Sequence, residues 1–342
     1  MSETQQLLKY AVAASASDLH ISAGSPIMVR VHGAMRKVDG KCITQDVAEN
    51  LINQLLNDAQ IDQLTRENEI DFSIENPEGR FRANVFQQRQ GLGAVFRIIP
   101  ERIPTMEELH LPKTLREMID LENGLILVTG PTGSGKSTSL ASMINYVNEN
   151  KSGHIITIED PIEFIHKSNK CVVNQRQIGT NTQSFANALR SALREDPDYI
   201  LVGEMRDLET ISLALTAAET GHLVFGTLHT SSAPKTITRI IDIFPSDQKH
   251  QIRLQVAESL RGVVAQRLYP RKDNTGRIAA FELMIANQAI RNLIREEKTF
   301  QIDSVIQTGR QFGMQSLEQS KRQLISEGVL SPEYLEERNI LC

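Results

Sequence analysis

Residues 130–138 read GPTGSGKST and match every position of the phosphate-binding loop pattern G-x-x-x-x-G-K-[ST]. The apolar run 125–129 before them predicts a buried strand, and residues 136–147 predict a helix. A chance match in a flexible Gly/Ser loop would lack that strand, whereas strand, loop and helix in this order form a phosphate cradle. The sequence therefore predicts an α/β core that binds a nucleoside triphosphate.

The residue types in this loop suit both phosphate and Mg²⁺. Glycines let backbone N–H groups converge on phosphate oxygens, and the helix N-terminus adds the positive end of its dipole. The Lys136 ammonium can reach the β- and γ-phosphates, and the Ser137 hydroxyl can ligate Mg²⁺. We therefore predict ATP and Mg²⁺ as cofactors, with nucleotide contacts from Gly130, Thr132, Gly133, Ser134, Gly135, Lys136, Ser137 and Thr138.

Composition narrows the class of protein further. A chain of 342 residues is long enough for about two domains. Its net charge of -5 argues against a protein whose main role is to bind nucleic acid. The N-terminus has no basic segment followed by an apolar one, and no apolar run approaches a membrane span, so we expect a cytoplasmic protein. The spacing of Cys42, Cys171 and Cys342 predicts neither a disulfide nor a zinc site.

Residues 1–100 predict a small domain of helices and short strands, and the Pro-containing segment 101–121 predicts a linker with a short helix. A helix is expected from residue 6 to 16 and another around Val47, Leu51 and Leu55. The two alternating runs at 70–74 and 80–85, with turn residues between them, predict a hairpin. The other strands are expected at 19–21, 27–31, 35–38 and 93–99.

From residue 122 to 342, strands alternate with helices, which predicts a parallel sheet. The region from residue 233 onward is expected to be mostly helical, with a turn at 274–276 before the segment 277–284. In the core, strands are expected at 155–158, 199–202 and 223–227, and helices at 182–193 and from Asp207 to residue 220.

Carboxylates follow two of the predicted core strands. Glu159, Asp160 and Glu163 repel one another unless they share a cation, so Mg²⁺ or its waters are expected there; the alternative is an acidic loop or helix N-terminus. Glu204 ends the strand 199–202 and is placed to orient the attacking water. Gly203 occupies the position where a Walker B aspartate is usual, so metal binding is expected from the acidic segment instead.

His222 and His229 flank the strand 223–227. A histidine at a strand end is ordinarily a structural group. Beside a phosphate loop, one imidazole can donate to the γ-phosphate and the other can bridge to a neighbouring subunit. We predict the γ-phosphate contact for His229 and a nucleotide-binding role for His222.

Three arginines of the first domain, Arg80, Arg82 and Arg97, have two interpretations. They can form a solvated strand face. Alternatively, they can reach a neighbouring subunit's nucleotide as arginine fingers, which stabilise charge on the transferred phosphoryl group.

These features resemble the PilT family, the type IV pilus retraction ATPases of the secretion ATPase superfamily, and the resemblance spans nearly the whole chain. The segment 289–296, AIRNLIRE, resembles a signature of the retraction branch that the family needs for retraction; the alternative is a packed surface helix. The other matching segments are 16–20, 130–138, 158–164, 188–198, 203–207 and the histidine box 221–230.

The resemblance implies a PAS-like N-terminal α+β domain, then a RecA-like P-loop ATPase core with a helical C-terminal region, assembled as a hexameric ring with ATP at subunit boundaries. It implies that the atypical Walker B with Gly203 is normal and that Arg82 and Arg97 point toward the neighbour's nucleotide. The predicted catalytic set is Glu204, Lys136, Arg97, Arg82, His229 and Glu163.

The expected function is a cytoplasmic motor, peripheral at the inner membrane at the pilus base, that acts on a membrane platform protein and returns pilins to the membrane. A second retraction ATPase paralogue is a possible partner, and nucleic acid is not expected. A pilus-assembly or type II secretion motor is the main alternative, but it typically carries a tetracysteine module and a longer N-terminal region. A RecA-like nucleic-acid motor would need a basic, aromatic loop, and intact Lys136 and Glu204 argue against a non-catalytic paralogue.

Overall fold

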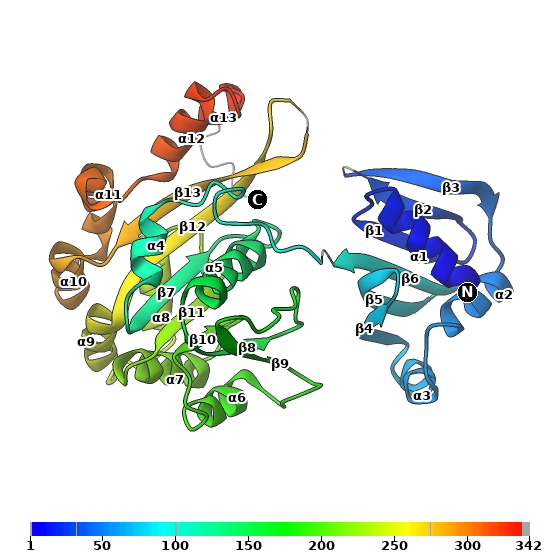
Figure 1. Ribbon diagram of the computed structural model, residues 1–342, viewed down its shortest axis with the longest axis horizontal. Coiled ribbons are helices and arrows are strands. Elements are labelled where there is room, and N and C mark those ends of the chain that lie inside the picture. Colours follow the sequence, from blue (N-terminus) through cyan, green and yellow to red (C-terminus); the bar gives the residue numbers. More distant parts are fainter. Residues whose placement is uncertain (1, 32, 100, 274, 337–342) are drawn as a thin grey trace. The chain divides into compact units, whose positions relative to one another are not determined.

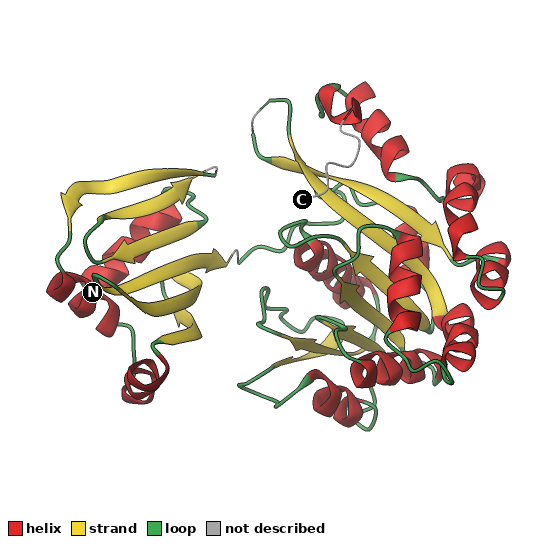
Figure 2. Ribbon diagram, turned by 180° about the vertical axis from the view of Figure 1, so that it is seen from behind, coloured by secondary structure: helices red, strands yellow, loops and turns green. Residues whose placement is uncertain are grey.

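The computed structural model describes residues 2–31, 33–99, 101–273 and 275–336, and the chain divides into two compact units, Met1–Arg102 and Ile103–Cys342 (Figure 1). Figure 2 shows that the strands of each unit gather into one sheet flanked by helices. Three residues used in the predictions lie outside the described residues: Pro100 at the end of the first predicted domain, Asn274 in the predicted turn, and Cys342. Among the described residues, no helix is both long and apolar enough to cross a membrane.

The first unit is built on an antiparallel sheet with strand order β3-β2-β1-β6-β5-β4. The predicted hairpin is confirmed, because β4 pairs with β5 along its whole length. Alternate residues of β5, Phe81, Ala83 and Val85, are fully buried, so Arg80 and Arg82 occupy the opposite face. The strands are β1 (Asp18–Ser22), β2 (Pro26–Val31), β3 (Ala34–Cys42), β4 (Glu69–Asn76), β5 (Gly79–Gln88) and β6 (Gly91–Ile99).

Three helices complete this unit: α1 (Glu3–Ala13), α2 (Gln45–Asn53) and α3 (Asp58–Glu67). Helix α1 begins earlier than predicted because Ser2 and Gln5 form a capping box at its N-terminus. Helix α3 was not predicted from the sequence. Leu64 is the one residue of α3 classed as buried, so its sequence carries little of the apolar periodicity that marks a packed helix.

The second unit contains a sheet with strand order β13-β12-β7-β11-β10-β8-β9, in which all neighbouring pairs are parallel except β12 and β13. The strands are β7 (Gly124–Thr129), β8 (Gly153–Glu159), β9 (Cys171–Gln177), β10 (Tyr199–Val202), β11 (Leu223–Leu228), β12 (Leu260–Pro270) and β13 (Arg277–Ile285). The predicted α/β class and parallel pairing of the core strands are confirmed.

Helices cover both faces of this sheet. Leu125 and Leu127 of β7 pack in one hydrophobic cluster with α6 to α10, whereas Ile126 and Val128 pack in another with α4 and α5. The helices are α4 (Thr114–Ile119), α5 (Lys136–Asn150), α6 (Phe185–Ala192), α7 (Leu208–Glu219), α8 (Ala233–Asp242), α9 (Lys249–Ser259), α10 (Gln288–Arg295), α11 (Ile302–Thr308), α12 (Leu317–Ser326) and α13 (Glu333–Glu336). Burial on both faces explains why the core strands are continuously apolar.

Three strands of this sheet, β9, β12 and β13, were not predicted from the sequence. The expectation that the chain is mostly helical from residue 233 is wrong for β12 and for β13, which pairs with it. The apolar run of β12 around Val263 and Val264 is too short for periodicity to distinguish a strand from a buried helix. Strand β9 lies at the sheet edge, where Val172 is exposed and polar side chains are common, so its sequence resembled a loop.

Helix α10 contains most of the predicted AIRNLIRE helix. The side chain of Asn287 caps it, and Ile290 and Ile294 are fully buried in the core. Arg295 donates a hydrogen bond to the carboxylate of Glu258 in α9. The helix is therefore confirmed, while its role in retraction remains a prediction.

We predict that Phe225→Ala lowers the free energy of unfolding by about 3–5 kcal/mol, because it leaves a cavity in the centre of the sheet where Phe225 is fully buried. The matched control is Phe300→Ala, since Phe300 is 75% exposed and its loss removes little packing. Urea unfolding of the two full-length variants measures the difference, and equal stability losses would contradict the assignment of the core.

Candidate nucleotide-binding site

Parallel pairing brings four loops to one edge of the second sheet. Strands β7, β11, β10 and β8 are consecutive neighbours, so the segments that follow them emerge side by side. These segments are the phosphate loop, the segment with His229, the segment with Glu204 and the acidic segment that begins at Asp160. Ligands of open α/β sheets bind at this carboxyl edge.

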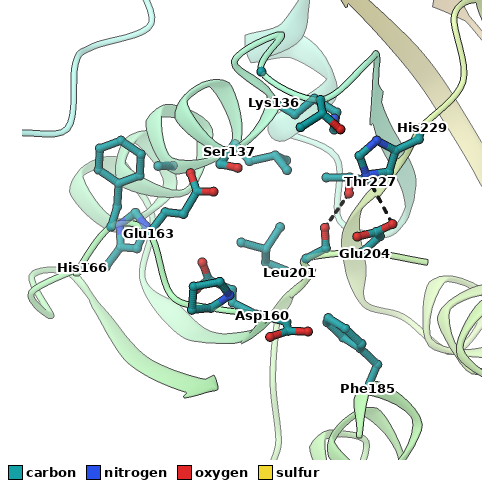
Figure 3. Close-up of a pocket in the computed structure, with 18 residues that line it drawn as sticks. Lys136, Ser137, Asp160, Glu163, His166, Phe185, Leu201, Glu204, Thr227 and His229 are labelled. Atoms are coloured by element: carbon teal, nitrogen blue, oxygen red, sulfur yellow. Dashed lines mark hydrogen bonds and ion pairs between the residues drawn. The ribbon is translucent and has the colours of Figure 1, made fainter. Parts of the chain in front are cut away.

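A pocket of about 190 Å³ lies at this edge (Figure 3). It brings together all the residues predicted for catalysis and metal binding on this unit, and its walls come from the loop, α5 and the three other segments. The predicted residues that line it are Thr132, Gly133, Lys136, Ser137, Glu159, Asp160, Glu163, Glu204 and His229.

Lys136 is held against its own loop. Its Nζ donates to the carbonyl oxygens of Gly130, at 2.9 Å, and Pro131, at 3.1 Å. Burial lowers the pKa of Lys136, and the negative charges of Glu204 and Glu163 oppose that shift. Those two carboxylates therefore help to keep the ammonium charged where phosphate would bind.

Glu204 is the carboxylate best placed for proton chemistry. Its Oε1 lies 3.3 Å from Nε2 of His229, and Arg206 forms an ion pair with it. Burial raises the pKa of Glu204, but the hydrogen bond from Arg206 and the electrostatic interactions with His229, Arg206 and Lys136 outweigh burial and bring that pKa below its ordinary value. Glu204 is therefore ionised at neutral pH and can accept a proton from water.

The backbone at Gly203 explains the missing Walker B aspartate. A Cβ at this position would lie 3.0 Å from the carbonyl oxygen of Ile158 and 3.2 Å from Cα of Glu159. The Gly203 N–H donates to that same Ile158 oxygen at 2.7 Å, and the Thr227 hydroxyl donates to the Gly203 carbonyl. Glycine therefore permits close contact with β8, and the two hydrogen bonds fix the strand tip that presents Glu204.

The acidic residues lie in different environments. Glu159 is largely buried, which raises its pKa, and its Oε1 accepts hydrogen bonds from Thr157 at 2.6 Å and Gln175 at 3.2 Å. Those bonds engage the Glu159 carboxylate within β8 and β9. Asp160 and Glu163 also line the pocket, so this geometry favours them over Glu159 as partners of a cation or its waters.

The donor set fits Mg²⁺ only with help from the nucleotide. Among the described residues, no group of three or more His, Cys, Asp or Glu side chains is arranged to hold a metal ion. Mg²⁺ ordinarily keeps several waters and is bound through one or two protein oxygens plus substrate phosphates. The Ser137 hydroxyl, with Asp160 or Glu163 acting through water, suits that mode.

The structure does not bring His222 into this pocket. His222 precedes β11, at the amino end of the sheet, and its carbonyl accepts a hydrogen bond from the N–H of Gly124 at the start of β7. Its Nδ1 lies 2.9 Å from the carbonyl oxygen of Ala217, as in an ordinary structural histidine. Because β11 crosses the sheet between His222 and His229, only His229 reaches the carboxyl edge, where the phosphate loop lies.

The predicted arginines belong to the first unit. Arg82 and Arg97 are directly opposite each other on β5 and β6, with 43% and 69% of their side chains exposed. Arg97 contacts Asp18 at 3.1 Å, whereas Arg82 lies 3.9 Å from Asp71. Like charges opposite each other in a sheet are unfavourable, and Asp18 and Asp71 offset them here. Arg80 pairs with Glu75.

Several pocket residues were missed by the sequence analysis. His166 is buried, which lowers its pKa to about 4, and Phe185, Leu201 and Thr227 also line the pocket. Gln175 of β9 holds the acidic segment: its Nε2 donates to the Phe164 carbonyl, and its Oε1 accepts from the His166 N–H, both at 2.8 Å. A polar residue on an edge strand is ordinarily solvated, so the sequence carried no signal for Gln175.

A phosphate loop, an ionised carboxylate at a neighbouring strand tip and a histidine against it define a P-loop ATPase. The family model for type II/IV secretion system proteins matches residues 2–338. The chain belongs to this family and, within it, to the PilT pilus retraction ATPases.

The individual relatives support this placement. The type IV pilus retraction ATPase PilT of Pseudomonas aeruginosa is 53% identical over 334 residues, which cover 97% of each chain. A twitching motility protein of Neisseria gonorrhoeae is 53% identical over 307 residues, 90% of this chain and 82% of the relative. A crystal structure of the pilus retraction motor PilT with bound ADP has a TM-score of 0.90 and 47% identity, covering 98% of this chain and 96% of that one.

We predict that Glu204→Gln lowers the ATPase turnover number at least about 100-fold, because the neutral amide cannot take a proton from water. ATP binding should persist, since the phosphate loop is unchanged. Glu209→Gln is the matched control, because Glu209 is exposed on α7 and pairs with Arg190. Steady-state hydrolysis and equilibrium ATP binding measure the two quantities, and wild-type turnover in Glu204→Gln would remove Glu204 from the mechanism.

Proposed function

We propose that this chain is an ATP-hydrolysing motor that powers type IV pilus retraction. The observation that carries this proposal is the ionised Glu204 beside the phosphate loop, in a chain that matches PilT over nearly its full length. The loop binds the triphosphate, and hydrolysis at this pocket supplies the work. Pilin depolymerisation and twitching motility follow from that work.

The pocket residues have different roles in ATP binding and hydrolysis. Lys136 binds the β- and γ-phosphates, and Glu204 orients the attacking water and accepts its proton. His229, in contact with Glu204, donates to the γ-phosphate and reports its presence to the segment leading into α8. When bound, Mg²⁺ neutralises phosphate charge; Ser137 would ligate it directly, and Asp160 and Glu163 would hold its waters.

We assign the two units to a PAS-like domain, residues 1–100, and a RecA-like core, residues 122–342. The linker is assigned to residues 101–121, and its helix α4 packs against the sheet of the second unit. The antiparallel sheet with its own hydrophobic core supports the first assignment. The parallel strands with a phosphate loop after β7 support the second, and α10 to α13 supply the helical C-terminal region.

The motor works as a homohexamer in which a site is completed by its neighbour. Arg82 and Arg97 act in trans, and His222, outside its own pocket, belongs to the face that meets another subunit. In the cell it lies in the cytoplasm at the pilus base, where it acts on an inner-membrane platform protein together with a second retraction ATPase paralogue. Contact with the membrane occurs through partner proteins only, and nucleic acid is not a ligand.

We predict complementation between two inactive variants. Arg97→Ala keeps its phosphate loop but cannot complete a neighbour's site, whereas Lys136→Ala has a defective loop but retains Arg97. Each alone should lose at least about 100-fold of ATPase activity, and mixed rings should regain a measurable fraction, because an arginine finger acts across the boundary. Arg66→Ala, at an exposed position on α3, is the control. Failure of the folded mixture to regain activity would contradict action in trans.

Deletion of the gene, followed by imaging of surface pili, tests the cellular function. We expect hyperpiliated cells that do not twitch, because assembly continues without removal of pilins. Complementation with the intact chain should restore twitching, and complementation with Glu204→Gln should not. Bald cells would instead identify an assembly motor.

A further inference from the structure

Gln266 of β12 lies against the phosphate loop, although 132 residues separate it from Ser134 in the sequence. Its side chain is buried, with 3% exposure. The Gln266 Nε2 donates to the Ser134 carbonyl at 2.7 Å, and its Oε1 accepts from the Ser139 hydroxyl at 2.8 Å. The side-chain amide of Gln266 therefore connects Ser134 of the loop with Ser139 in α5.

The Ser134 carbonyl fixes which way this amide points. A carbonyl oxygen can only accept a hydrogen bond, whereas the Ser139 hydroxyl can donate or accept. Rotating the amide of Gln266 would place two oxygens face to face at Ser134, so Nε2 must face the loop. The Ser134 bond is therefore the one that specifies glutamine at position 266.

This bond also orients the next N–H of the loop. A trans peptide is planar, with its C=O and N–H pointing in opposite directions. Because the Ser134 carbonyl points toward Gln266, the N–H of Gly135 in the same peptide unit points away from β12. Backbone N–H groups at the start of a P-loop helix are ligands for phosphate.

The backbone conformation of Gly135 and the absence of a side chain there allow the close approach of Gln266. Its φ of +88° lies in the region that favours glycine, and a Cβ there would lie 2.8 Å from Nε2 of Gln266. A side chain at position 135 would therefore both strain the backbone and displace the amide. The second glycine of the loop pattern and the glutamine of a distant strand form one packed unit.

We propose that Gln266 is a positioning residue for nucleotide binding, acting through the Ser134–Gly135 peptide rather than by touching the nucleotide. This inference rests on the proposed role of the loop as the ATP site. The competing explanation is that Gln266 merely satisfies buried polar groups and stabilises the fold. The two differ in whether ATP affinity changes when stability does not.

The experiment compares ATP dissociation constants, KM and kcat of full-length variants, together with melting temperatures without nucleotide. Gln266→Glu keeps the acceptor for Ser139 but turns a carboxylate oxygen toward the Ser134 carbonyl. We expect about tenfold weaker ATP binding and a matching rise in KM, with kcat changed less than about threefold. Ser139→Ala, which spares the Ser134 bond, should bind ATP within about threefold of the wild type.

A double variant separates positioning from stability. Gln266→Met leaves both the Ser139 hydroxyl and the Ser134 carbonyl without their partners. Adding Ser139→Ala removes the first of these orphan groups and should recover part of the lost melting temperature. We expect the double variant to keep the roughly tenfold loss of ATP affinity. Wild-type affinity in the double variant, or a tenfold loss in Ser139→Ala alone, would overturn the proposal. A wild-type chain that does not bind ATP would overturn the proposed function as well.

Discussion

The parallel pairing of β7, β11, β10 and β8 is the constraint on which the site depends. Parallel strands direct all their carboxyl ends to one edge, so loops from distant parts of the sequence meet there. The pairing is maintained by strands buried on both faces: all residues of β7 and β11 are buried. The same apolar packing that stabilises this unit therefore determines where its polar groups converge.

The charged groups at that edge are partly removed from water, so each depends on its neighbours to stay charged. Lys136 is desolvated, which disfavours its charged form, and Glu204 is partly desolvated as well. Each supports the charge of the other, and Arg206 and His229 add to the stabilisation of the carboxylate. The result is an ammonium for phosphate and a carboxylate for water. Hydrogen bonds from Lys136 and Gln266 hold the phosphate loop, and those of Gly203 with Ile158 and Thr227 hold the tip of β10.

Sequence analysis predicted the elements with strong local signals. The phosphate loop, the hairpin of β4 and β5, the Asp207 cap of α7 and the core strands have patterns that depend on neighbouring residues alone. Strands β12, β13 and β9 were not predicted, since short apolar runs and a polar edge strand are ambiguous without their partners. Gln266 and Gln175 were missed for the same reason: each lies on one of these strands and acts on residues distant in sequence.

Local sequence patterns were enough to predict that this chain binds a nucleoside triphosphate, which carboxylate ends the strand before α7, and which family the chain resembles. Which of the predicted residues share the pocket depends on the folded sheet, where His229 lies beside Glu204 and His222 lies at the opposite end of β11. The tertiary structure also shows that Gly203 permits close contact with β8. Local patterns encode residue type and secondary structure, but strand order and packing distances arise only when the whole sheet assembles.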